Sequence, residues 1–122
     1  PMTASTSVSD RQRIVERYVD GFRTGDHAVI HGCLTDDVSW DIVGYTTADG
    51  REAFDALIDG PPGATLPRLT IERHLEQGDV VATYGAGEFE TADGETHAFR
   101  FADTFTFRGD LICAVTSYVV QL

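Results

Sequence analysis

One acidic residue, Asp103, stands within a row of aromatic residues in the second half of the chain. The segment alternates as a β-strand does, and this alternation places on one face His97, Phe99, Phe101, Asp103, Phe105 and Phe107. Burial among aromatic rings disfavours an ionised carboxylate and raises its pKa. We therefore expect either a neutral carboxylic acid that donates a hydrogen bond to a ligand oxygen, or a carboxyl that pairs with a polar core residue or faces water.

Two further residues, Tyr18 and Asp41, carry groups suited to acid–base chemistry. Tyr18 lies on the apolar stripe of an expected helix, where a buried hydroxyl usually finds a hydrogen-bond partner. Taken alone, that position fits ordinary core packing as well. Asp41 lies at the end of an expected strand, where an aspartate more often faces solvent than takes part in catalysis.

Other kinds of chemistry find little support in the motifs. The four histidines are scattered along the chain, so we predict no metal site. No glycine-rich phosphate loop follows a strand and no G-x-S-x-G sequence occurs, so we predict no cofactor. Cys33 and Cys113 are expected to be buried reduced thiols. His97 is the one histidine that we expect near a pocket.

Composition points to one globular domain. The chain has 122 residues, of which 42% are hydrophobic and 24% are charged. Its net charge of −11 repels phosphate backbones and anionic lipid surfaces, so we expect neither a nucleic-acid nor a membrane partner. The sequence shows no signal-peptide pattern and no long apolar run, and we expect a cytoplasmic protein.

The first half of the chain is predicted to be mainly helical. Residues 1–8 are expected to form a flexible tail before a single domain over 9–122. Ser9 and Gln12 form a capping-box pattern that begins a helix with a single apolar stripe, and Gly25 ends it. Shorter helices are expected over 26–34 and 49–58, on either side of a strand over 38–43.

The second half is predicted to be a run of four strands. Alternating segments over 69–76, 80–90, 97–108 and 111–120 are separated by turn sequences that include Asp93-Gly94 and Gly109-Asp110. Helices followed by an antiparallel run indicate an α+β fold, a curved and mostly antiparallel sheet wrapped around the N-terminal helices.

Three short segments resemble a known family. They are Arg17-Tyr18-Val19 with Gly25-Asp26 beyond it, Asp36-Asp37 before Trp40-Asp41-Ile42-Val43-Gly44, and Asp103-Thr104-Phe105-Thr106-Phe107-Arg108-Gly109. Together they resemble the bacterial ketosteroid isomerases and, more widely, the nuclear-transport-factor-2-like superfamily with its SnoaL-like polyketide cyclases. The resemblance covers nearly all of the chain after the tail and implies a cone-shaped cavity between helices and sheet.

The resemblance also implies roles for these residues. Asp41 would be the general base, and Tyr18 and a protonated Asp103 would donate hydrogen bonds to an enolate oxygen, as in the ketosteroid isomerases. The ligand would be a flat, apolar, oxygenated molecule such as a steroid or an aromatic polyketide, and the protein would be a homodimer through its outer sheet face. The expected cavity walls are Trp40, Phe54, Tyr84, His97, Phe99, Phe101, Phe105 and Tyr118.

One departure from the family concerns Asp41. The stretch from Asp37 to Asp41 is one residue shorter than in the isomerases, and Ile42 stands where they have a proline. A slip of one residue turns a strand side chain to the opposite face. Asp41 then points outward and Val38, Trp40 and Ile42 line the cavity, unless a bulge restores the register.

Three functions are therefore open. The first is an enzyme that isomerises or cyclises a ketone through an enolate without a cofactor. The second is a non-catalytic protein that binds small molecules on the same scaffold. The third is an epoxide hydrolase or dehydratase. It ranks lower, because the epoxide hydrolases that resemble this fold use an arginine two positions before an aspartate, whereas Arg100 precedes Asp103 by three residues and lies on the opposite face of the strand.

Overall fold

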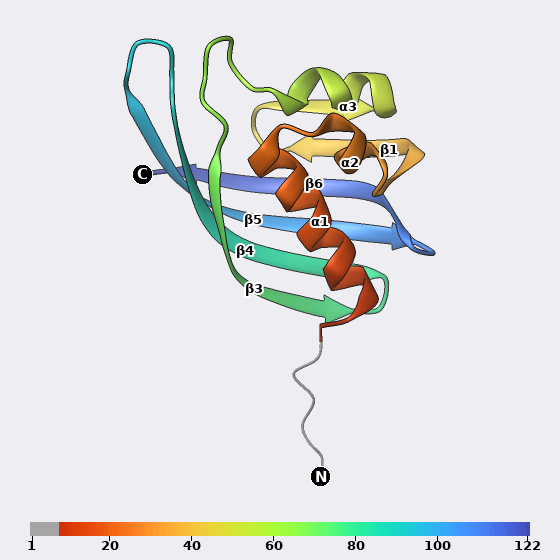
Figure 1. Ribbon diagram of the computed structural model, residues 1–122. Helices are drawn as coiled ribbons and strands as arrows, with labels where there is room; N and C mark the ends of the chain where they lie inside the picture. The colour runs from red at the N-terminus through yellow and green to blue at the C-terminus, as the bar shows by residue number, and fades with distance from the viewer. Residues whose placement is uncertain (1–7) are drawn as a thin grey trace.

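Three helices lie against one face of a curled six-stranded sheet in the computed structural model, which describes residues 8–122 (Figure 1). In chain order the elements are α1 (Asp10–Thr24), α2 (His27–His31), β1 (Leu34–Ile42), β2 (Thr46–Asp49), α3 (Arg51–Ile58), β3 (Arg68–Gln77), β4 (Val80–Glu90), β5 (Thr96–Arg108) and β6 (Leu111–Gln121). The strand order is β2-β1-β6-β5-β4-β3, and of the neighbouring pairs in this described sheet β1 and β6 are parallel and the others antiparallel. The predicted α+β class and curved, mostly antiparallel sheet are confirmed.

Helix α1 begins and ends where the sequence predicted. Ser9 Oγ accepts a hydrogen bond from the backbone N–H of Gln12 at 3.1 Å, which satisfies one free donor of the first turn. Only half of the capping box forms, because the Gln12 side chain donates to Glu76 on β3 instead. Gly25 ends the helix at a φ of 69°, a left-handed conformation that favours glycine.

The short elements between α1 and β3 differ from the prediction. The second helix ends at His31, and Leu34 already pairs with Ile112 of β6. Strand β2 was not predicted, and Gly44 lies in the turn that joins it to β1. The pairing of Leu34 with Ile112 joins distant segments, and local hydrophobic spacing does not reveal it. Strand β2 has only four residues, too few for a clear alternation.

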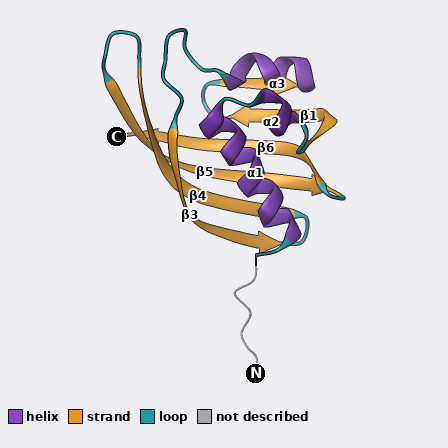
Figure 2. Ribbon diagram, viewed as in Figure 1, coloured by secondary structure: helices purple, strands orange, loops and turns teal. Residues whose placement is uncertain are grey.

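The sheet and helices enclose a core at one end and leave space at the other. Phe105 and Phe107, late in β5, are buried together with Val15 of α1 and Ile112 of β6. At the opposite end, Figure 2 shows the long loop between α3 and β3 beside the β4–β5 turn. The backbone N–H of Thr65 in that loop donates to the carbonyl of Glu90 at 2.9 Å and ties the loop to β4.

Two expectations concern the ends of the chain and membranes. The tail expected over residues 1–8 falls outside the described residues except for Val8, which is exposed. Within residues 8–122, no helix combines the length and the apolar character needed to cross a lipid bilayer.

Candidate functional site

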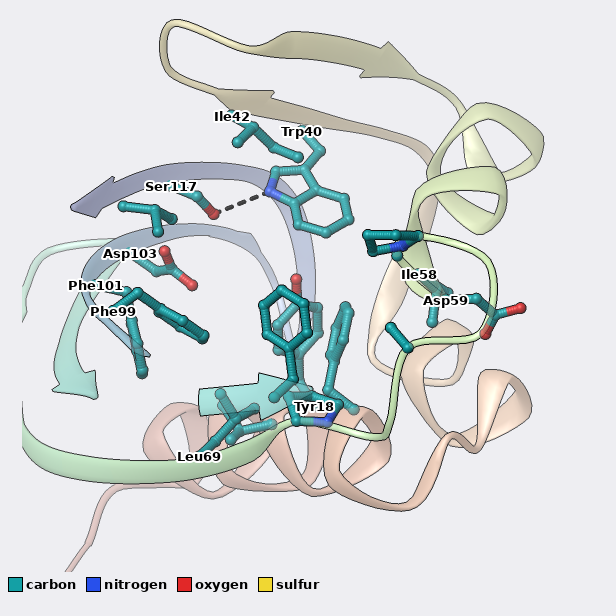
Figure 3. Close-up of a pocket in the computed structure, with 18 of the residues that line it drawn as sticks. Tyr18, Trp40, Ile42, Ile58, Asp59, Leu69, Phe99, Phe101, Asp103 and Ser117 are labelled. Carbon is teal, nitrogen blue, oxygen red and sulfur yellow. Dashed lines mark hydrogen bonds between the residues drawn. The ribbon is translucent and has the colours of Figure 1, made fainter. Parts of the chain in front are cut away.

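A cavity of about 250 Å³ opens between α1, the α3–β3 loop and the inner face of the sheet (Figure 3). Its walls are mostly apolar. They consist of Tyr18, Val19, Phe22, Trp40, Ile42, Ile58, Asp59, Gly60, Pro61, Ala64, Thr65, Pro67, Leu69, Phe89, Phe99, Phe101, Asp103, Ser117 and Val119. Among residues 8–122, two carboxyl groups reach this cavity, that of Asp103 inside it and that of Asp59 at its edge.

The Asp103 carboxyl projects from β5 into the cavity (Figure 3). Its Oδ1 atom is buried and has no hydrogen-bond partner among residues 8–122. Burial raises the pKa of Asp103 to about 7, and the Ser117 hydroxyl opposes part of that rise. Near neutral pH the carboxyl therefore exists in both forms, and it can accept or release a proton.

Tyr18 reaches the same cavity from α1. Its ring is 3% exposed and lies 5.0 Å from the ring of Phe22 and 5.1 Å from that of Phe105, measured between centroids. Burial raises the pKa of the Tyr18 phenol well above its usual value, and the negative charge of Asp103 adds to the effect. The phenol therefore keeps its proton and can serve as a hydrogen-bond donor beside the carboxyl.

Trp40 and Ser117 form a buried hydrogen bond at the cavity wall. The indole Nε1 of Trp40 donates to Ser117 Oγ at 2.9 Å, drawn as a dashed line in Figure 3. Trp40 stacks on Phe54 with ring centroids 4.6 Å apart, which fixes the indole orientation. Ser117 in turn pairs directly with Asp103 in the β5–β6 register. Trp40, Ser117 and Asp103 thus lie in a row along one wall of the cavity.

Glycines of β4 make room for two aromatic side chains of β5. Gly87 pairs with Phe99 and Gly85 pairs with Phe101. A Cβ on Gly85 would lie 2.6 Å from Cζ of Phe101, closer than real contacts allow. The rings therefore lie down over the glycines, and the space above them remains open.

The cavity position that the family resemblance implies for Asp41 is corrected, because Asp41 points outward, as the shortened stretch before it indicates. Asp41 is exposed and is not part of the cavity wall, whereas Trp40 and Ile42 on either side of it are. The pairing of β1 with β6 shifts between Leu34 and Ser39 and then runs without interruption to Ile42. Since no extra residue separates Trp40 from Asp41, alternation turns the Asp41 carboxyl outward.

The predicted wall residues fall into three groups. Trp40, Phe99 and Phe101 line the cavity, as do Tyr18 and Asp103 of the predicted catalytic set. Phe54 and Phe105 are fully buried behind the wall, against Trp40 and Tyr18.

The remaining three predicted wall residues lie elsewhere. Tyr84 and Tyr118 point to the outer face of the sheet, with 38% and 51% of their surface exposed, so their placement in the wall is corrected. His97 is also outside the wall, because its ring stacks on Phe89 at 5.3 Å and its Nε2 contacts Thr91 Oγ1 at 3.1 Å.

Several wall residues were not predicted. Phe22 belongs to the apolar stripe of α1, and Phe89 and Val119 alternate with residues on the outer face of β4 and β6, so periodicity could have indicated them. The loop residues from Asp59 to Pro67 gave no such signal, because a segment rich in glycine and proline has no period to read.

A cluster of histidines and carboxylates links α2 to α3 at the cavity edge. Asp55 Oδ1 contacts His27 Nδ1 at 2.6 Å and His31 Nε2 at 2.8 Å, and Asp59 Oδ1 contacts His27 Nε2 at 2.6 Å. Asp55 and then Asp59 raise the pKa of His27 through these contacts. Within the described part of the chain, no group of histidine, cysteine and acidic residues is arranged to hold a metal ion.

Comparison with known proteins finds one matching domain family and several similar solved structures. Residues 15–115 match the model of the SnoaL-like domain family. Among solved structures, TerC co-crystallised with polyporic acid is 23% identical, with a TM-score of 0.81 over 89% of this chain and 90% of TerC. An LEH-like epoxide hydrolase from M. tuberculosis is 19% identical, with a TM-score of 0.79 over 91% of this chain and 83% of that one.

A third similar structure has a ketosteroid isomerase-like fold. A hypothetical protein from Catenulispora acidiphila with a ketosteroid isomerase-like fold, in complex with trimethylamine, is 17% identical, with a TM-score of 0.78 over 86% of this chain and 83% of that one. No curated protein matches the chain. At these identities the likeness to solved structures establishes the fold.

Proposed function

The chain belongs to the SnoaL-like domain family, and we propose that it is a cofactor-free acid–base enzyme that acts on a flat apolar ketone, steroid-like or polyketide-like. The observation that carries the proposal is the Asp103 carboxyl, which stands in an apolar cavity with its pKa raised to about 7. A strongly perturbed carboxyl in a cavity is a common mark of a functional group.

The cavity suits a ligand with one polar edge and a flat apolar body. Phe99 and Phe101 offer aromatic surface next to Asp103, and Trp40 faces the same space. The Tyr18 phenol supplies a hydrogen-bond donor for a ligand oxygen near the carboxyl. Stacking and burial would hold the body of such a ligand, and the donor would fix its orientation.

The general base is assigned to Asp103 rather than to Asp41. The family resemblance gives Asp103 the part of a hydrogen-bond donor, but the Asp41 carboxyl lies outside the cavity. The ionised Asp103 would take a proton from the carbon beside the ketone, so that the C–H electron pair forms an enolate. Tyr18 would donate a hydrogen bond to the enolate oxygen, an interaction that is strong in a dry site.

Two outcomes follow from one enolate. In an isomerisation, the protonated Asp103 returns its proton to a different carbon of the conjugated system, and the double bond moves. In a cyclisation, the enolate carbon attacks a second carbonyl carbon of the same molecule, and the resulting alkoxide receives the proton. Both reactions conserve protons and electrons, and neither needs a cofactor.

A spectrophotometric assay tests this proposal. A β,γ-unsaturated ketosteroid is mixed with the protein, and absorbance reports the conjugated enone. Turnover should be lost in Asp103→Asn, whereas Asp41→Asn makes the same change on the outer face and should keep it. If every substrate of this class is bound and none is converted, the enzymatic proposal is wrong.

The alternative function is a small-molecule-binding protein without turnover. In its favour, the second carboxyl at the cavity, that of Asp59, is 76% exposed and already contacts His27. Trp40 is the only tryptophan in the chain and lines the cavity, so its fluorescence reports occupancy directly. Quenching by polyporic acid without conversion of any ketone would favour this alternative.

Epoxide hydrolysis receives less support. Arg100 is exposed on the outer face of β5, and no arginine lines the cavity in residues 8–122. A cationic partner for the carboxyl, on which the lower-ranked hypothesis depended, is thus missing from the described wall.

The outer face of the sheet supports the proposed homodimer. Tyr84, Ala102 and Tyr118 pair across β4, β5 and β6 in one row, so two exposed tyrosines flank a small residue. Val120, 61% exposed, extends this surface along β6. A second copy of the sheet would cover these apolar side chains.

A further inference from the structure

We propose that Ser117 is a positioning residue for Asp103, the last donor in a hydrogen-bond chain that runs from Trp40 Nε1 to Ser117 Oγ and from the Ser117 hydroxyl to the Asp103 carboxyl. The inference rests on the proposed acid–base role of Asp103. It adds that the cavity wall itself holds the carboxylate in place and keeps part of it ionised.

The first link fixes the direction of the chain. An indole N–H is a donor and has no acceptor function. The 2.9 Å contact therefore requires Ser117 Oγ to accept the hydrogen bond from Trp40. Stacking on Phe54 and burial of Trp40 leave the indole little freedom to turn away.

The second link follows because the proton of the Ser117 hydroxyl still needs an acceptor. Ser117 is 4% exposed, so its hydroxyl proton has little access to water and needs an acceptor inside the protein. Asp103 is its direct partner across the β5–β6 pair, and both side chains reach the cavity. Directly paired side chains have their Cβ atoms about 5 Å apart, within reach of a hydroxyl and a carboxyl.

The hydrogen-bond chain opposes the effect of burial on the pKa of Asp103. Desolvation favours the neutral acid, whereas a hydroxyl that donates to the carboxyl favours the ionised form. Because the indole polarises the serine hydroxyl, both links support the same charge state. A general base needs an ionised fraction at the working pH, and the opposed effects supply one near neutrality.

The test is a pH titration of the Asp103 side-chain carboxyl followed by ¹³C NMR, with the signal assigned by its loss in Asp103→Asn. Ser117→Ala removes the donor and should raise the apparent pKa of Asp103 by about 1, the size expected for a hydrogen bond to a charged group. Ser117→Thr keeps a hydroxyl and should restore the original value.

Two further variants complete the design. Thr116→Ala removes a hydroxyl from the adjacent, outward position of β6 and should leave the titration unchanged. Trp40→Phe removes the first donor and should raise the apparent pKa by less than Ser117→Ala does. It also provides a readout if Ser117→Ala fails to fold.

The outcomes separate this inference from the proposed function. An unchanged Asp103 titration in Ser117→Ala overturns the positioning role, even if Asp103→Asn abolishes turnover. A raised titration midpoint, with Thr116→Ala unchanged, supports it even if no substrate is turned over. Where turnover occurs, the pH profile of kcat/KM should move to higher pH with the titration.

Discussion

Phe99 lies directly over Gly87 of the neighbouring strand, so closely that a Cβ on Gly87 would fall 2.4 Å from Cζ of the ring. Aromatic residues that cover a glycine in this way fill the gap left by the missing side chain. Here the arrangement also keeps the ring flat against the sheet. The depth of the cavity thus depends on a residue that is not part of its wall.

Gly87→Ala should therefore weaken ligand binding. The added methyl group forces the Phe99 ring upward into the cavity, an overpacking that costs about 1–3 kcal/mol. If this cost falls on the bound state, we expect a loss of affinity for a flat aromatic ligand of roughly 5- to 150-fold, measured by quenching of Trp40 fluorescence. Gly32→Ala, at the end of α2 and away from the cavity, is the control, and an equal loss in both would contradict the role of Gly87.

Asp103→Asn should stabilise the protein, and increasingly so as pH rises. The folded pKa is about 7, against 3.8 for an unperturbed aspartate, so the folded state holds a proton that the unfolded state releases between these values. Over that range the wild-type protein loses up to about 4 kcal/mol of unfolding free energy. Asparagine has no such titration.

Urea unfolding across the pH range checks this prediction. The difference between Asp103→Asn and the wild type should be small near pH 4 and grow until pH 8. A difference that stays constant over this range would mean that the Asp103 carboxyl titrates alike in the folded and unfolded chains. Stability lost through a functional carboxyl is a common cost of an active site.

Sequence alone predicted the Asp103 face of the site well, because β5 is a long strand whose alternation is unambiguous. Phe99, Phe101 and Asp103 share the inner face, as their spacing required. The prediction that Tyr84 and Tyr118 line the cavity was wrong, because aromatic character does not indicate which face of a strand a residue occupies. Each is paired with Ala102 and therefore lies on the side opposite Asp103.

Asp41 had two expected orientations, inward by the family resemblance and outward by the shortened stretch, and the sequence alone could not choose between them. Its face depends on the irregular pairing of β1 with β6 before Ser39, and register between distant strands leaves no local signal. The position of the α3–β3 loop could not be predicted either, since its place at the cavity follows from its contacts with β4.

Tyr18→Phe should lower turnover while leaving the fold intact. The ring keeps its packing against Phe22 and Phe105, and only the hydroxyl is lost. Removal of one donor to a developing enolate oxygen lowers kcat by about 100-fold in comparable sites. Steady-state kinetics on the ketosteroid would measure it, and a change confined to KM would assign Tyr18 to binding alone.

His27 should stabilise the protein mainly at low pH. Asp55 and Asp59 raise its pKa in the folded state, so its contribution is complete below about 6.5 and is lost as pH rises through the higher folded value. Urea midpoints of the wild type and His27→Gln should therefore converge at alkaline pH. A gap that persists there would mean that His27 acts by packing, and Asp55→Asn should reduce the pH dependence.

Tyr118→Glu should separate the proposed homodimer. The substitution places a carboxylate in the centre of the outer face, beside Ala102 and across from Tyr84, where two copies would otherwise bury these side chains. Tyr45→Glu is the matched control, because Tyr45 is 79% exposed in the β1–β2 turn, away from that face. Sedimentation should give twice the chain mass for the wild type and for Tyr45→Glu, and the single-chain mass for Tyr118→Glu. Because Tyr118 lies outside the cavity, ligand quenching of Trp40 should persist in the monomer, and a wild type that sediments as a single chain would contradict the dimer.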